Sequence, residues 1–135
     1  MQAHSAALDD IESVHALLET AGVQVERASL ERRLADRDGG IVLASSATIS
    51  WVMDGAALHL YDIVGLPDQL LVLLRLITTI AHEQLAVVLV ATLYADDPMT
   101  AVLEKAGFAR DWEEADVREG RVRSLFTFLH MLEEE

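Results

Sequence analysis

Residues 58–83 read LHLYDIVGLPDQLLVLLRLITTIAHE, and this stretch decides the fold. In its first third, successive side chains would point alternately to two opposite faces, which predicts a β-strand over 57–64. Gly-Leu-Pro at 65–67 predicts a very tight turn, and Pro67 is a favoured first residue of a helix. The apolar run that follows predicts a helix that ends near Gln84. A strand, a turn and a helix in this order can bind an anion, because the helix N-terminus presents free N–H groups.

The helix predicted over 67–84 carries apolar residues on nearly all of its sides. Such a helix is either the central buried helix of a domain or one that also faces a partner chain. Residues 86–93, AVVLVATL, predict the next strand, buried on both faces as in a parallel sheet. The three elements together predict a right-handed β-α-β unit.

The other segments predict further helices and strands on both sides of this unit. An apolar stripe that includes Ile11, Val14 and Leu18 predicts an amphipathic helix over 8–21. Ser29 is a favoured N-cap for a second short helix over 29–37. The remaining predictions are strands at 40–46, 48–53, 110–118 and 122–132, and a helix at 98–106 that Asp97 can cap and Gly107 can end.

The composition limits the function classes. A chain of 135 residues, 52% of them hydrophobic, predicts a single domain spanning residues 1–135 with a proper core. The net charge of −13 argues against nucleic acid and anionic membranes as partners, since both require a cationic surface. The chain has no cysteine, and no pair such as His82 and Glu83 has the spacing of a metal site. No signal peptide or membrane-spanning run is evident, so we expect a cytoplasmic protein without a metal.

Asp62 and His59 are the candidate bases on the strand at 57–64. Strict alternation places Asp62 on the same face as Leu58, Leu60 and Val64, an unusual place for a carboxylate. If that face is buried, Asp62 could act as a base. The alternative is that Asp62 lies near the strand end, where it is solvated or caps the turn. His59 is the second candidate and lies one face away.

The predicted order is helix, helix, three strands, helix, strand, helix and two strands. With LEKAGF at 103–108, this order resembles the fold of the GCN5-related N-acetyltransferase (GNAT) family over nearly the whole chain. The late helix of that family typically ends in Glu-Lys-x-Gly-Phe, which Glu104, Lys105, Gly107 and Phe108 match. The resemblance implies an α/β fold with a GNAT-like central mixed sheet of about six strands flanked by about four helices.

Three departures concern the family's coenzyme A site. The family's strand–helix junction normally carries Arg/Gln-x-x-Gly-x-Gly/Ala, whose backbone N–H groups hold the pyrophosphate. Here VGLPDQL at 64–70 is shorter and passes at once into the helix, and Asp68 carries a negative charge where a phosphate would lie. Two like charges ~4 Å apart cost roughly 1 to 4 kcal/mol. Leu103 aligns with the tyrosine that commonly protonates the departing thiolate, and Asp96 aligns with a conserved asparagine of the family's motif.

The resemblance implies two functions, and the sequence leaves open whether the protein is an enzyme. The first is transfer of an acetyl group from acetyl coenzyme A to a cationic amine, such as a polyamine, an aminoglycoside or a lysine, with Asp62 or His59 as base. The residues that would hold the cofactor are Ile63, Val64, Gly65, Leu66, Gln69 and Asp96. The alternative is a non-catalytic binding or regulatory module, homodimeric through the central helix or the last strand. A structural α/β domain of unrelated ancestry is a third reading.

Overall fold

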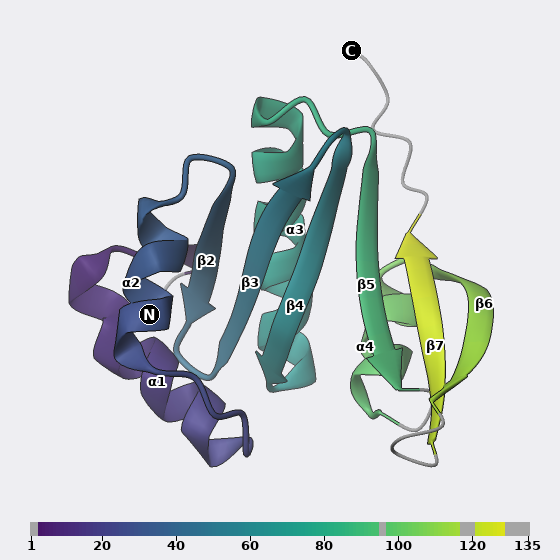
Figure 1. The fold of residues 1–135 in the computed structure, drawn as a ribbon, viewed down its shortest axis with the longest axis horizontal. Helices are drawn as coiled ribbons and strands as arrows, with labels where there is room; N and C mark the ends of the chain where they lie inside the picture. The colour runs from purple at the N-terminus through teal and green to yellow at the C-terminus, as the bar shows by residue number, and fades with distance from the viewer. Residues whose placement is uncertain (1–2, 95–96, 117–120, 129–135) are drawn as a thin grey trace.

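The computed structural model describes residues 3–94, 97–116 and 121–128 (Figure 1). Its helices are η1 (Leu8–Asp10), α1 (Ile11–Thr20), α2 (Arg27–Ala35), α3 (Pro67–Glu83) and α4 (Met99–Lys105). Its strands are β1 (His4–Ser5), β2 (Gly39–Ala44), β3 (Ala47–Asp54), β4 (Ala57–Gly65), β5 (Val88–Tyr94), β6 (Ala109–Asp116) and β7 (Arg121–Phe128). The predicted α/β fold class is confirmed, and the described residues add only the two-residue β1 to the strands predicted from the sequence.

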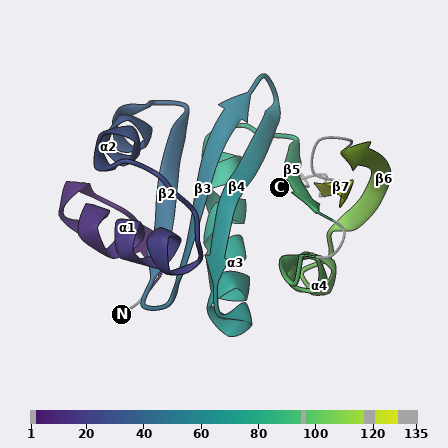
Figure 2. The same cartoon turned by 60° about the horizontal axis from the view of Figure 1, so that its bottom comes forward.

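The strands form one mixed sheet in the order β1-β2-β3-β4-β5-β7-β6. β4 and β5 pair in parallel and are joined by α3, so the predicted β-α-β unit is confirmed. The other neighbours within the described residues pair antiparallel. The helices α1 and α2 lie on one face of the sheet, and α3 lies on the opposite face (Figures 1 and 2).

The two faces of the sheet support separate hydrophobic clusters. In β2, Ile41 and Leu43 pack with α1 and α2, whereas Val42 and Ala44 pack with the cluster around α3. This alternation is the period-two pattern of a strand covered on both faces. The sheet is therefore the central layer of the fold, with α1 and α2 on one face and α3 on the other (Figures 1 and 2).

The helix α3 is amphipathic, which corrects the prediction of apolar residues on all sides. Its buried side chains face the sheet and are those of Leu70, Leu73, Leu74, Ile77, Ile80 and Ala81. Asp68, Val72, Arg75 and Thr79 are exposed and recur at helical spacing on the outer face. The prediction was wrong because leucines also occupy the flanks of this helix, where they are only partly buried.

The strand β5 is buried on one face only, so the prediction of burial on both faces was wrong. Leu89 and Ala91 are buried, while Val88 and Val90 are partly buried and Thr92 is exposed. The parallel register His59↔Val90 places Val90 on the face of β4 that carries His59. On that face α1 and α2 contact β2, β3 and β4, so the side of β5 remains partly open.

Three helix ends test the capping predictions. Helix α2 begins at Arg27, so Ser29 lies inside it and is not its N-cap. Arg27 is held to Glu12 by two hydrogen bonds of 2.6 and 3.1 Å, which join the starts of α1 and α2. At α4, the Oδ1 of Asp97 accepts a hydrogen bond of 2.9 Å from the N–H of Met99, as expected of a cap. Gly107 follows with φ of 102°, which is the predicted left-handed helix ending.

Among the described residues, no helix is long and apolar enough to cross a membrane.

Candidate functional site

A β-bulge at Asp62 interrupts β4. Ser50 pairs with Tyr61 and Thr48 pairs with Val64, so one residue of β3 lies opposite two residues of β4. Asp62 has φ of 48°, a left-handed conformation that aspartate adopts more readily than most residues. The extra residue reverses the alternation of side chains beyond this point.

The bulge brings both candidate bases to one face of the sheet. Leu58 and Leu60 are buried in the cluster on the α3 side, so His59 and Tyr61 face the α2 side. Asp62 would follow Leu60 in a regular strand, yet its carboxylate lies 2.9 Å from the guanidinium of Arg33 on α2. The prediction that Asp62 shares a face with the two leucines was therefore wrong, and Asp62 lies on the same face as His59 instead of the opposite one.

Arg33 joins α2 to both β3 and β4. Its Nη1 donates to the Oγ of Ser50 at 2.9 Å and lies at the same distance from Oδ2 of Asp62. Its guanidinium also lies over the ring of Tyr61, 4.7 Å from the centroid, as in a cation–π contact. The side chains of Arg33 and Asp62 are only 15% and 23% exposed, so this is a half-buried pair and not a surface one.

Tyr61 and His59 differ in how firmly they are held. Burial raises the pKa of the Tyr61 phenol, and the nearby Arg33 lowers it by a smaller amount. The imidazole of His59 is 40% exposed, and its Nε2 lies 3.8 Å from a carboxylate oxygen of Asp54. Of the two candidate bases, His59 is thus the more accessible, whereas the carboxylate of Asp62 already has a cationic partner.

The strands β4 and β5 separate at the bulge. Their parallel pairing runs from Ala57↔Val88 to Leu60↔Ala91 and stops there, although β4 continues to Gly65 and β5 continues to Tyr94. Figure 1 shows the two strands diverging toward the N-terminus of α3. The facing backbone edges of both strands beyond Leu60 are therefore not hydrogen-bonded to each other. An extended ligand could bind to them, since unpaired strand edges offer donors and acceptors.

The junction between β4 and α3 has room only for glycine. Gly65 has φ of 134°, and a Cβ built on it would lie 2.3 Å from the carbonyl oxygen of Ser46 and 2.4 Å from Cα of Ala47. The backbone at Gly65 therefore packs directly against the β2–β3 turn. This close approach fixes the path of residues 65–67 into the helix.

Most backbone donors at this junction already have acceptors. The N–H of Leu66 donates to the oxygen of Ser46 at 3.1 Å, and those of Gln69 and Leu70 donate to the oxygen of Leu66. Pro67 has no N–H. Within the described residues, this leaves the N–H of Asp68 as the donor of residues 66–70 without an acceptor.

The predicted cofactor residue Gln69 is bound to the β2–β3 turn. Its Oε1 accepts a hydrogen bond from the N–H of Ser46, and its Nε2 donates to the Oγ of Ser45 at 2.9 Å. The side chain of Leu66 is exposed beside it. The other aligned positions are less informative, because Leu103 is fully buried in the core and Asp96 lies outside the described residues.

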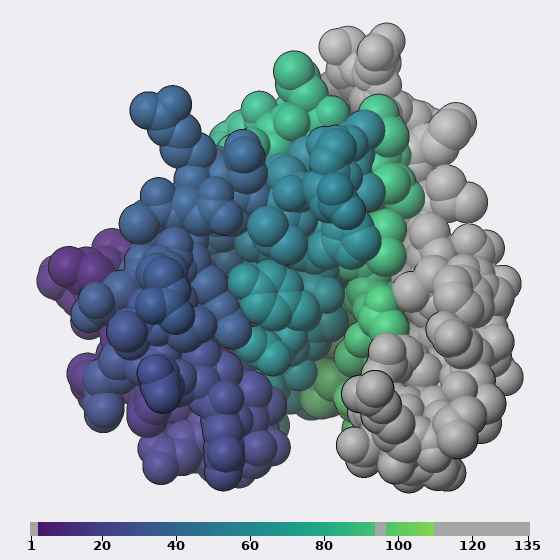
Figure 3. All heavy atoms as spheres, viewed as in Figure 1, coloured from purple at the N-terminus to yellow at the C-terminus, as the bar shows by residue number. Residues whose placement is uncertain are grey.

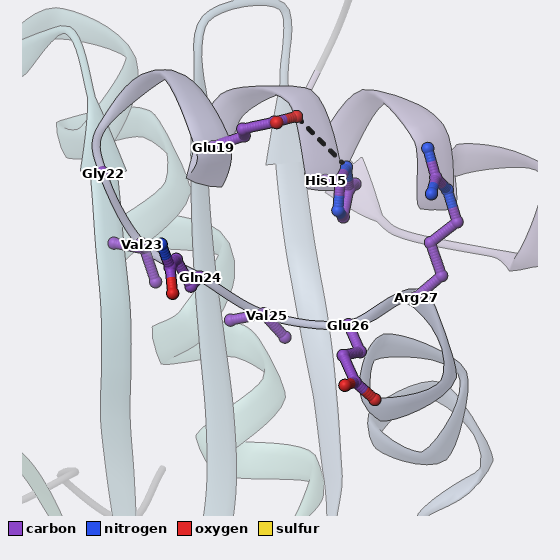
Figure 4. A pocket seen from close by; sticks show the side chains of 8 residues that line it. All are labelled: His15, Glu19, Gly22, Val23, Gln24, Val25, Glu26 and Arg27. Atoms are coloured by element: carbon purple, nitrogen blue, oxygen red, sulfur yellow. Dashed lines mark ion pairs between the residues drawn. The ribbon is translucent and has the colours of Figure 1, made fainter.

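Two hollows lie near these elements. One of about 640 Å³ is bounded by α1, the β2–β3 turn and the end of β4, and it includes the predicted cofactor residues Val64, Gly65 and Leu66. The other, of about 610 Å³, lies between α1 and the loop that leads to α2 (Figure 4). In Figure 4 His15 lies above the loop, and its Nδ1 is 3.7 Å from a carboxylate oxygen of Glu19. None of the predicted site residues lines this second hollow.

Sequence reasoning did not identify Arg33, Tyr61 or Ser50 as parts of the site. Arg33 lies on a different element, 29 positions before Asp62, and no local pattern connects the two. The bulge carries no glycine or proline that would have revealed it. In the described part of the chain, no group of three or more His, Asp or Glu side chains is arranged to hold a metal ion.

Comparison with known proteins identifies the fold through solved structures. No family model and no curated protein sequence matches the chain. Among solved structures, aminoglycoside 6'-acetyltransferase type Ii superposes with a TM-score of 0.81 at 10% identity, over 100% of this chain and 99% of that one. The ribosomal-protein-S18-alanine N-acetyltransferase of Escherichia coli gives 0.77 at 12% identity, over 99% and 96%.

A protein of the GNAT family from Desulfovibrio desulfuricans gives a TM-score of 0.76 at 15% identity, over 93% of this chain and 96% of that one. These values confirm the architecture expected from the element order and from Glu104, Lys105, Gly107 and Phe108. The chain therefore has the fold of the GCN5-related N-acetyltransferases.

Proposed function

We propose that this GNAT-fold protein has lost acetyl transfer and works as a binding or regulatory module. The observation that carries the proposal is the direct junction between β4 and α3. Gly65 ends the strand, Pro67 begins the helix, and the β2–β3 turn already accepts the N–H of Leu66. A pyrophosphate would find few free backbone donors here.

Electrostatics support the same proposal. Asp68 lies in the first turn of α3, and its charge would repel a phosphate by roughly 1 to 4 kcal/mol at ~4 Å. The net charge of −13 adds a long-range repulsion to any polyanionic cofactor. A favourable dipole at a helix N-terminus contributes only about 0.3–1 kcal/mol at an exposed site. Because Asp68 is exposed, the repulsion is at least comparable to what the helix end contributes.

The candidate catalytic groups also support a loss of chemistry. Leu103 is fully buried and has no proton to donate to a departing thiolate. The carboxylate of Asp62 is paired with Arg33 through Oδ2, so an amine substrate would compete with a guanidinium for it. Each of these features would slow an acetyl transfer that relied on a general acid and a general base.

A second candidate is an N-acetyltransferase that acts on a cationic amine. The separation of β4 and β5 beyond Leu60 favours it, because the free strand edges could hold the extended arm of acetyl coenzyme A. His59 would serve as base on the accessible face. Direct attack by an amine requires mainly positioning and deprotonation, so the loss of a general acid is tolerable. The acidic surface would attract polyamines, aminoglycosides or lysine side chains.

Isothermal titration with acetyl coenzyme A at moderate ionic strength tests the proposal. We expect no detectable binding at millimolar cofactor. Binding in the micromolar range would contradict the proposal, and a screen of cationic amines with His59→Ala and Asp62→Asn would then identify the base.

A parallel titration with acetyl-pantetheine separates the two parts of the cofactor. If the free edges of β4 and β5 still bind the arm, acetyl-pantetheine will bind at least as tightly as acetyl coenzyme A. The opposite order would mean that the junction at Gly65 stabilises the phosphates after all. Aminoglycoside 6'-acetyltransferase type Ii, a solved structure of the same fold, is a suitable positive control.

A further inference from the structure

The hollows of the described structure differ in charge. The hollow of about 640 Å³ at the end of β4 has no charged side chain in its wall. The hollow between α1 and the following loop has two glutamates against one arginine. A third hollow, of about 310 Å³, lies between α2 and the sheet. Its wall includes Ser29, Arg32, Arg33, Asp36, Val52 and Tyr61.

This α2–sheet hollow has more positive than negative side chains. Two arginines stand against one aspartate in its wall, in a chain whose net charge is −13. The carboxylate of Asp36 is already hydrogen-bonded at the end of α2, where its Oδ1 accepts a hydrogen bond of 2.9 Å from the N–H of Asp38. Asp62, which pairs with Arg33 from beside the wall, balances the second arginine, so the hollow is close to neutral in a strongly acidic protein and can accept a ligand with one negative charge. A more highly charged anion would meet the repulsion of the whole molecule.

The guanidinium of Arg33 is only partly used by the protein. Its Nη1 interacts with Asp62 and Ser50, and within the described residues Nε and Nη2 donate to no acceptor. Arginine presents five N–H donors in a planar fork, and the unused edge matches the two oxygens of a carboxylate. Because Arg33 is anchored by Asp62, Ser50 and the Tyr61 ring, its unused edge is held in place before any ligand binds.

The rest of the wall suits the same group. Arg32 is exposed and forms no ion pair with another described residue. The hydroxyl groups of Ser29 and Tyr61 are further donors, while Val52 gives the wall a partly buried apolar side chain. In Figure 3 this side of the molecule, where α2 meets β3 and β4, faces the viewer.

We propose that the α2–sheet hollow binds a small monocarboxylate, with its oxygens on Arg32 and Arg33 and its apolar body against Val52. None of the residues at the β4–α3 junction lines this hollow. The proposal is therefore independent of whether coenzyme A binds, and its test uses no coenzyme A.

Butyrate is the probe, with n-butylamine and n-butanol as ligands of similar size but opposite or no charge. The readout is the amide NMR signals of Gly39, Gly40 and Val52, which border the hollow. We expect saturable shifts of these signals with butyrate and none with the other two. Shifts with butylamine, or shifts with butyrate that do not saturate, would overturn the proposal.

Variants identify the groups responsible. Arg32→Gln removes an exposed side chain without disturbing the Arg33–Asp62 pair, and we expect roughly tenfold weaker butyrate binding. Arg75→Gln on the outer face of α3 is the matched control and should bind like the original protein. Arg33→Gln would leave Asp62 unpaired, so the double variant Arg33→Gln/Asp62→Asn replaces it. Butyrate binding that survives both Arg32→Gln and the double variant rules the site out.

Discussion

At the scale of single residues, backbone strain at Leu85 gives the simplest prediction. Leu85 follows α3 with φ of 60°, and its side chain is 83% exposed. The N–H of Ala86 donates to the oxygen of Ala81, as in a helix ending that usually carries glycine. We expect Leu85→Gly to raise the free energy of unfolding by about 1 kcal/mol, measured by urea denaturation. Leu85→Ala keeps the Cβ and is the control, because it should leave the stability unchanged.

Gly65 should be intolerant of any side chain. A Cβ there would meet backbone and Cβ atoms of Ser46 and Ala47 at 2.3–2.5 Å, and the φ of 134° is itself unfavourable for other residues. We expect Gly65→Ala to lower the free energy of unfolding by more than about 2 kcal/mol. Gly55 also has a positive φ but nothing within 4 Å of its Cβ position, so Gly55→Ala shows the cost of strain without a clash. Equal losses for the two variants would contradict the clash.

At the residue scale, the sequence analysis and the structure differ in the position of Asp62. Gly107 and Phe108 could be predicted, because a left-handed helix ending followed by a buried aromatic residue is a local pattern. The position of Asp62 could not be predicted, since period-two alternation assumes a regular strand. A bulge has no sequence signature here, and it moved Asp62 to the face of His59 and Arg33.

At the scale of elements, the side chain of Gln69 joins α3 to the β2–β3 turn. It makes two hydrogen bonds, one to the N–H of Ser46 and one to Ser45 Oγ. Gln69→Leu would leave the N–H of Ser46 without this acceptor, and we expect a loss of about 1–3 kcal/mol in the free energy of unfolding. Ser45→Ala removes only the exposed bond and should cost less. If both variants cost the same, the bond to Ser46 does not stabilise the junction.

The N-terminal segment should respond to acid through Asp10. The N–H of Ala7 donates to its carboxylate at 2.9 Å and lowers its pKa below the usual 3.8, with His4 adding to the effect. A carboxyl whose pKa is lower in the folded state stabilises the fold above its unfolded pKa. That contribution is lost as the pH falls below 3.8 toward the folded value.

We therefore expect the urea midpoint to fall less steeply in Asp10→Asn than in the original protein as the pH decreases from 5 to 3. Asp9→Asn, a change at the neighbouring position, is the control and should keep the original slope. Parallel slopes for Asp10→Asn and the original protein would show that the hydrogen bond does not affect the pH dependence.

Element prediction succeeded wherever the evidence was local. The order of helices and strands, and the parallel β4–β5 pair, followed from periodicity and from the tight turn at 65–67. Burial was harder, because a leucine on the flank of α3 looks like a leucine in its core until the sheet is present. The start of α2 was missed for a similar reason, since Arg27 is fixed by an ion pair with Glu12 on another helix.

At the scale of the whole molecule, the homodimer stays a prediction, and the two surfaces expected to form it are neither strongly apolar nor an open strand edge in the described residues. The outer face of α3 is mostly polar, and β7 is paired with β5 on one edge and β6 on the other. We therefore expect sedimentation velocity at micromolar concentration to show a single species near 14.8 kDa. A species of twice that mass would restore the homodimer and place its interface on another surface.

The sheet order also constrains the order in which the chain can fold. Because β7 lies between β5 and β6, the last strand of the sheet to leave the ribosome is an interior one. Until residues 121–128 are available, β6 has no neighbour in this order, and β5 has an unprotected edge. The strand β5 therefore lacks its neighbour on this edge until β7 has been made, and β6 is made before its partner in the sheet.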